Sequence, residues 1–60
     1  MPNLSRTDLS EANLNGADLK YAVLRGADLK NTDLKNSVFY MADLTSASLG
    51  GTNLTSTTLT

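Results

Sequence analysis

The sequence has 60 residues, enough for one small domain spanning residues 1–60 with a core of limited size. Five basic and six acidic side chains leave a net charge of −1, which is too balanced to indicate binding to nucleic acid or to an anionic membrane. The lack of cysteine and histidine excludes disulfides, zinc fingers and catalysis by Cys/His or Ser-His-Asp sets.

Leucine recurs at every fifth position through the whole chain, and phenylalanine replaces it once. The residue two positions before each of these centres is small, and the residue one before is mostly Asp or Asn. We therefore expect the centres to form one core column, which consists of Leu4, Leu9, Leu14, Leu19, Leu24, Leu29, Leu34, Phe39, Leu44, Leu49, Leu54 and Leu59.

A period of five fits neither a helix nor a straight strand, because both would point successive leucines in different directions. All the centres can face inward only if the chain bends once in every unit. Glycine or asparagine stands two residues after the centre in five units, and a type II turn needs such a residue to accept a positive φ. Arg6, Glu11, Tyr21 and Met41 occupy the same slot, so we expect those corners to use a turn without that requirement.

One five-residue motif recurs almost unchanged in four places: EANLN at 11–15, GADLK at 16–20 and 26–30, and MADLT at 41–45. The chain resembles the pentapeptide-repeat family, whose consensus is A-(D/N)-L-X-X, over essentially its whole length. The resemblance implies an all-β fold, a right-handed quadrilateral β-helix (a β-solenoid) with one unit per side and four units per coil. Twelve units then make about three coils, and residues twenty apart lie on top of one another.

In the first coil, the start MPNLSRTDLSEANL shows no basic region followed by an apolar one, and no later run approaches the roughly 20 apolar residues of a membrane span. We therefore expect no membrane span and favour a cytoplasmic location. Asp8 and Asp28 stack one coil apart, but two carboxylates are too few ligands to predict a metal site.

In the middle of the chain, three aspartates each precede a lysine by two positions, which predicts outward-facing ion pairs of small energy. Arg25, Lys30 and Lys35 form a partial basic belt, but acids interrupt it, so we predict no nucleic-acid partner. A convex prism offers no cleft for paired carboxylates. We predict no enzyme activity, no catalytic residue, no cofactor and no metal.

The stretch KNSVFYMADL, residues 35–44, departs from the repeat. Stacking at twenty residues places Phe39 in the core and Met41 over Tyr21. It also gathers the apolar exceptions on one corner, and we predict this interaction patch from Tyr21, Val23, Val38, Tyr40 and Met41. Two interpretations stay open: local packing that stabilises the corner, or a contact surface for a partner.

The last coil ends in GGTNLTSTTLT, which is uncharged and rich in strand-favouring threonine, and these 60 residues contain no capping helix. Open coil edges invite pairing, so we expect a dimer or end-to-end stacking, unless the chain is a segment of a longer solenoid. The expected function is a non-enzymatic structural or protein-interaction module. The alternative is a DNA-mimicking binder of a type II topoisomerase, a gyrase inhibitor or protector, which some relatives in the family are.

Overall fold

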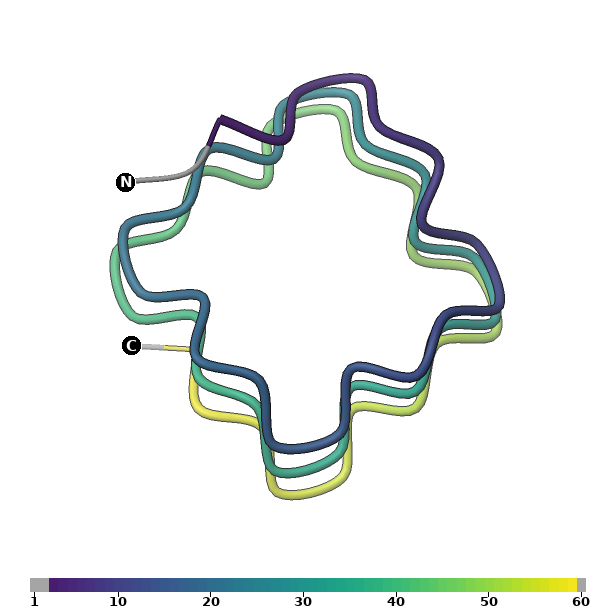
Figure 1. Cartoon of the computed structure of the whole chain (residues 1–60), viewed down its shortest axis with the longest axis vertical. Helices are drawn as coiled ribbons and strands as arrows, with labels where there is room; N and C mark the ends of the chain where they lie inside the picture. The colour runs from purple at the N-terminus through teal and green to yellow at the C-terminus, as the bar shows by residue number, and fades with distance from the viewer. Residues whose placement is uncertain (1–2, 60) are drawn as a thin grey trace.

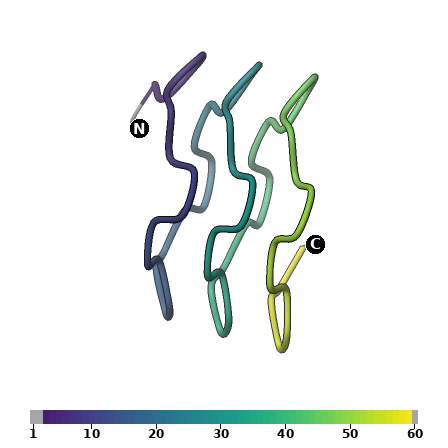
Figure 2. The same ribbon diagram turned by 90° about the vertical axis from the view of Figure 1, so that its right-hand side faces the viewer.

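The computed structural model describes residues 3–59, and in that range the backbone forms neither a helix nor a strand longer than one residue. Eight isolated parallel β-bridges instead join residues twenty positions apart, such as Asp8 with Asp28 and Asp28 with Ser48. The backbone therefore closes on itself every twenty residues and stacks as layers (Figure 1, Figure 2). We call residues 3–22, 23–42 and 43–59 the first, second and third layers. Together they measure 22 × 20 × 14 Å.

Every bridging residue lies one position before a centre leucine or phenylalanine, in the slot that is mostly Asp or Asn. The bridges make four columns, one on each side of the stack. The columns are formed by residues 3, 23 and 43, by 8, 28 and 48, by 13, 33 and 53, and by 18, 38 and 58.

Hydrogen bonds between layers follow one rule in every unit. The N–H of a centre residue and the N–H two residues later each donate to the carbonyl nineteen residues further on, as Leu24 does to Asp43 and Gly26 to Thr45, both at 2.8 Å. One N–H per unit donates in the opposite direction, as Asp43 does to Ala22 at 2.9 Å. A unit that lies between two layers thus sends two donors toward the following layer and one toward the preceding layer.

Each corner is a β-turn closed by a hydrogen bond from the N–H three residues after the centre to the centre carbonyl, at 2.9–3.2 Å. The residue at the third turn position has a positive φ in all eleven described turns, including Arg6 at 60°, Tyr21 at 62° and Met41 at 58°. The expectation that non-glycine corners use another turn is therefore wrong. At seven of these corners, all in the first and second layers, the N–H of this residue donates to the next layer, which fixes the same backbone path whatever the side chain.

The core lies in the second layer. Leu24, Leu29, Leu34 and Phe39 are at most 2% exposed, because each has a layer above and a layer below it. In the outer layers the centres of the predicted core column are less buried. Leu4, Leu9, Leu14, Leu19 and Leu44 are only partly buried, while Leu49, Leu54 and Leu59 are 38%, 39% and 56% exposed.

The small residues two before each centre fill the space that the leucines leave, and the polar ones among them are bonded. Thr32, Thr52 and Thr57 each donate a hydroxyl hydrogen bond of 2.7–2.9 Å to a centre carbonyl of the preceding layer. Ser37 donates to Leu34 O within its own turn at 2.7 Å. No buried side-chain polar atom in residues 3–59 lacks a partner, so threonine and serine enter the core at little cost.

Candidate interaction surfaces

The Asp and Asn side chains before the centres support the turns that follow them. Each accepts a hydrogen bond of 3.0–3.2 Å from the backbone N–H two residues later, an Asx arrangement that satisfies a donor the layers leave free. The residues are Asn3, Asp8, Asn13, Asp18, Asp28, Asp33, Asp43 and Asn53. Sequence reasoning treated this slot as solvent-facing and missed the role. The constant offset of Asp or Asn before each turn was the signal for it.

Two of these carboxyl groups also accept a hydrogen bond from a side-chain hydroxyl. The hydroxyl of Thr45, followed by its backbone N–H, lowers the pKa of Asp43, and Ser10 lowers the pKa of Asp8 in the same way. Because the folded pKa lies below the unfolded one, this stabilisation is complete above the unfolded pKa and is lost as the pH falls through the folded pKa. Stability should therefore fall as the pH is lowered from about 5 to about 3.

We expect Thr45→Ala to raise the pKa of Asp43, because the strongest donor to the charged form is removed. A carboxyl-carbon NMR titration measures this directly. Thr55→Ala is the matched control, because the Thr55 hydroxyl bonds Asn53, which does not titrate. An Asp43 titration curve that is the same in both variants would contradict the prediction.

The three predicted ion pairs are present, at 3.8 Å for Lys20 with Asp18 and 3.9 Å for Lys30 with Asp28 and Lys35 with Asp33. A fourth pair, Arg25 with Asp43 at 3.2 Å, joins the second and third layers and was not predicted. Every member of the basic belt therefore has an acidic partner, which leaves no uncompensated stripe of positive charge for a nucleic acid.

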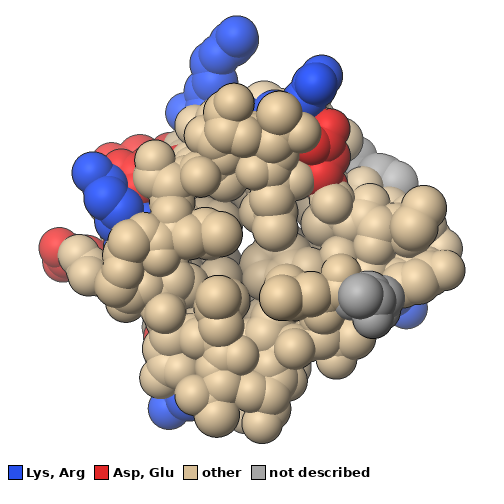
Figure 3. Space-filling view, turned by 180° about the vertical axis from the view of Figure 1, so that it is seen from behind, with Lys and Arg blue, Asp and Glu red and all other residues tan. Residues whose placement is uncertain are grey.

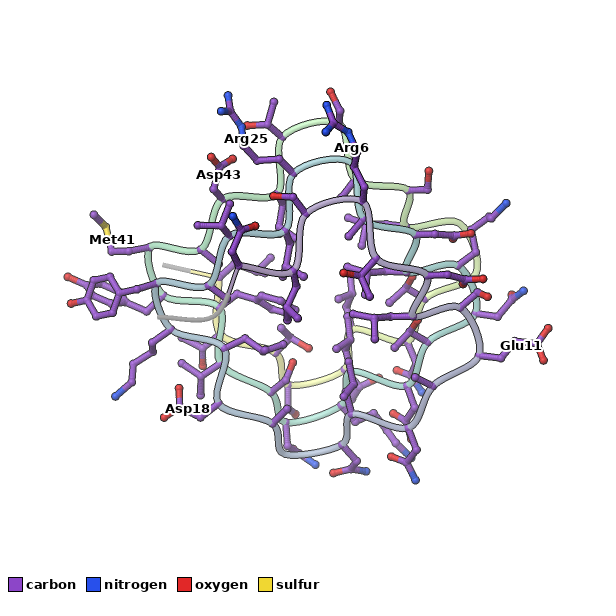
Figure 4. The ribbon with its side chains drawn as sticks, turned by 45° about the horizontal axis from the view of Figure 1, so that its top comes forward. Arg6, Glu11, Asp18, Arg25, Met41 and Asp43 are labelled. Atoms are coloured by element: carbon purple, nitrogen blue, oxygen red, sulfur yellow. The ribbon has the colours of Figure 1, made fainter. Side chains whose placement is uncertain are left out.

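One corner carries two arginines around a hollow of about 550 Å³, which is lined by Asn3, Ser5, Arg6, Arg25, Gly26, Thr45 and Ser46. Arg6, Arg25 and Asp43 project from this corner in Figure 4. The lining contains neither a carboxyl pair nor an activated nucleophile, so it has no residues for acid–base or covalent catalysis.

The apolar exceptions lie at and beside another corner, the one between the column of residues 18, 38 and 58 and the column of residues 3, 23 and 43 (Figure 1). The rings of Tyr21 and Tyr40 meet edge to face with centroids 5.6 Å apart and planes at 81°. Both rings are nearly half exposed, and Met41 is 65% exposed and points away from the ribbon in Figure 4. Val23 and Val38 are half-buried in the columns on the two adjoining sides.

The contact at this corner differs in detail from the stacking of Met41 on Tyr21 that the sequence suggests. The aromatic pair joins residues nineteen apart, alongside the backbone hydrogen bond from Tyr21 N to Tyr40 O at 2.8 Å. Val23 and Val38 replace the Asx acceptor in their units, so the turns after them lack the side-chain bond found in eight others.

The third surface is the end of the stack formed by the third layer. Seen from that end, it is built of uncharged residues around a central hollow, and the charged side chains lie at the rim (Figure 3). No charged residue follows Asp43 in the sequence. Leu49, Leu54 and Leu59 are the exposed leucines of this layer.

Residues 3–59 contain neither a metal-binding cluster nor a membrane-spanning helix. No group of three or more acidic side chains is placed to hold a metal ion there. In the same range no helix has the length and apolar character needed to cross a membrane.

The geometry agrees with comparisons to known proteins. Among solved structures, a pentapeptide-repeat protein from the cyanobacterium Cyanothece 51142 is similar, with 29% identity and a TM-score of 0.63 over 93% of this chain and 46% of that one. A second pentapeptide-repeat protein, from Nostoc Pcc 7120, has 31% identity over 92% of this chain and 58% of that one, with a TM-score of 0.34. The chain thus spans about half the length of these relatives. Among curated protein sequences, none matches it.

A profile of the pentapeptide-repeat family matches residues 3–40 and 22–60, with eight copies of the repeat. The two matches together cover nearly every residue, including the interrupted stretch around Phe39. The chain belongs to the pentapeptide-repeat family.

Proposed function

We propose that this chain is a non-enzymatic module that makes contacts between proteins, and that a second copy of the same polypeptide is its first partner. Pentapeptide-repeat proteins are generally structural rather than catalytic. The observation that carries the proposal is the exposure of the third-layer leucines. Leu54 is 39% exposed, whereas Leu34, its equivalent in the second layer, is fully buried by a layer on each side. A further layer would remove that apolar surface from water.

The architecture we propose is the right-handed quadrilateral β-helix of the family, with each layer as one coil. Family members of known structure adopt this fold. The path of the chain supports it: in Figure 1 the backbone runs clockwise, and Figure 2 places the first layer at the end nearest the viewer of Figure 1. A clockwise path that recedes from the viewer is right-handed.

Self-association of the 60-residue polypeptide should raise its apparent mass above 6.4 kDa as its concentration increases. Light scattering over a concentration series measures this. Leu54→Lys should suppress the increase, because it places a charge on the end surface, and Thr55→Lys is the control that adds the same charge to the outer surface. A well-folded monomer at every concentration would refute self-association.

We also propose the apolar corner of Tyr21, Val23, Val38, Tyr40 and Met41 as a contact surface for a protein partner. Its support is the half-exposed aromatic pair beside the exposed thioether of Met41, residue types that are enriched in interface cores. Tyr40→Ser combined with Met41→Ser should abolish any association made through this corner. If particle size and partner binding stay the same in that double variant, the corner only stabilises its own turn.

DNA mimicry, the alternative expected from the family, gains no support from the charge pattern. Four of the five basic side chains lie beside acids, so the surface is not strongly acidic. The shortest dimension, 14 Å, is under half of the roughly 34 Å turn of DNA. A supercoiling assay with and without the protein would reveal an effect on a topoisomerase.

A further inference from the structure

The two ends of the stack expose backbone groups of opposite kinds. At the third layer, the N–H groups of Leu44, Leu49 and Leu54 and of the turn residues Ser46, Gly51 and Ser56 donate to no backbone oxygen within residues 3–59. Their equivalents in the second layer all donate to the third layer. This end therefore presents two backbone N–H donors and one carbonyl acceptor for each five-residue unit.

The first layer presents the complementary set. In the second layer, the carbonyls of Asp28, Lys30, Asp33 and Lys35 accept hydrogen bonds from the first layer. Their first-layer equivalents, the carbonyls of Asp8, Ser10, Asn13 and Asn15, accept none within the described range. The first-layer end thus presents two acceptors and one donor for each unit, and exposed edge groups of this kind are templates for pairing.

We propose that copies of this polypeptide stack head to tail, with the third layer of one copy on the first layer of the next, in the register that continues the four columns. The proposal rests on the self-association proposed above and specifies its geometry. Head-to-tail contact pairs every donor with an acceptor, as between the layers of one chain. Contact between two third layers opposes donors to donors and leaves most of those N–H groups unpaired, at a cost that apolar burial must overcome.

The side chains of the two ends suit the same arrangement. The third-layer end is uncharged at its centre (Figure 3), so its exposed leucines meet the partly buried Leu9 and Leu14 of the next copy without burying a charge. Stacking restores to Leu49 and Leu54 the second neighbouring layer that makes the second-layer centres fully buried.

The register follows from the step in the stack. Because the layers rise continuously, each end has one step, and both steps lie between the column that begins with Asn3 and the column that ends with Thr58. When one copy is rotated on the other about the axis of the stack, only one orientation brings the two steps together. It places Ser48 opposite Asp8 of the next copy and Asn53 opposite Asn13, which continues the bridges at intervals of twenty residues. It also places Asp43 opposite Asn3, whereas two of the other rotations oppose Asp43 to an aspartate.

Paired cysteines test this geometry, because the natural sequence contains none. Asp8→Cys with Ser48→Cys brings thiols of successive copies together. Within one chain the two sites lie on opposite sides of Asp28, about 10 Å apart, too far for a disulfide. Asn13→Cys with Asn53→Cys is a second in-register pair. Asp8→Cys with Asn53→Cys is the matched off-register control.

After mild oxidation at concentrations where light scattering detects association, both in-register pairs should lose the monomer band. They should give a reducible ladder of dimers, trimers and larger species, because a heterologous contact repeats. The off-register pair should stay monomeric on the same gel. Circular dichroism confirms that each variant is folded.

The contrary outcomes separate the two proposals. A monomer in light scattering at every concentration overturns self-association and the stacking with it. Association that stops at a dimer, or a ladder formed equally by the off-register pair, overturns only the head-to-tail register and leaves self-association standing.

Discussion

Leu34→Ala should lower the free energy of unfolding by about 3–4 kcal/mol, which is the largest effect we expect from one substitution. Leu34 is fully buried in the second layer, with Leu14 and Leu54 at the same position in the layers on either side. Removing its side chain leaves a cavity that the fixed backbone ladder cannot close. Since a 60-residue domain has a stability near the low end of the usual 5–15 kcal/mol, only about 1–2 kcal/mol should remain, and roughly a tenth of the molecules should be unfolded without denaturant. Urea denaturation followed by circular dichroism measures the change.

Leu54→Ala is the matched control, because it removes the same atoms from the same position one layer further on. Leu54 is already 39% exposed, so the loss should be about 1–2 kcal/mol. Both variants are compared at low protein concentration, where stacking does not cover Leu54. Equal losses at the two positions would show that burial is uniform along the stack and would contradict the gradient described here.

Glycine at three corners should raise stability, by about 2 kcal/mol in the triple variant Glu11→Gly, Ser46→Gly and Ser56→Gly. These residues have φ values of 63°, 62° and 58°, a conformation that costs an L-residue about 1–2 kcal/mol. Glycine removes that cost, although its flexibility in the unfolded chain returns about 0.5–1 kcal/mol. The three positions lie at different corners, so their effects should add. Thermal unfolding and urea denaturation measure the gain.

Alanine at the same three positions is the control. Alanine removes almost as much of each side chain as glycine does, but it keeps the Cβ atom that makes a positive φ unfavourable. The alanine triple should therefore give no gain. If alanine stabilises as much as glycine, the benefit comes from losing the original side chains and not from the backbone conformation.

One bend in every unit was predictable because an inward leucine at every fifth position repeats along the whole chain. The stacking of residues twenty apart was implied by the resemblance to the family, because a period of five alone does not set the number of sides. The burial of each leucine was not predictable from that repeat. Leu34 and Leu54 have the same local sequence role, yet only Leu34 has a layer on both sides. Burial here depends on position in the stack, which a local pattern does not contain.

The turns show where local preference fails. Tyr21 and Met41 disfavour a positive φ as isolated residues, and turn propensity alone assigns them another conformation. In the first and second layers, hydrogen bonds from turn N–H groups to the next layer override such a preference. Tyr21 illustrates this directly, because its N–H donates to Tyr40 O at 2.8 Å.

The apolar corner was predictable as a set of residues but not as a set of contacts. Stacking at twenty residues correctly placed Tyr21 and Met41 on the same corner, since the columns fix which turns are neighbours. The edge-to-face contact of Tyr21 with Tyr40 depends on the directions in which two adjacent turn positions send their side chains. Side-chain direction at a positive φ is not contained in the repeat.

The single-residue bridges have a consequence for how such a chain can change in length during evolution. An insertion of one residue moves every following centre leucine to an outward position and brings the Asp or Asn before it into the core. An insertion of five keeps every leucine inward but moves Tyr40 and Met41 one corner away from Tyr21, which separates the aromatic pair. Only gain or loss of twenty residues preserves both the interior and the pattern of the outer surface. The core is preserved when any number of five-residue units is duplicated. Surface contacts between layers should be preserved only when whole layers of twenty residues are duplicated.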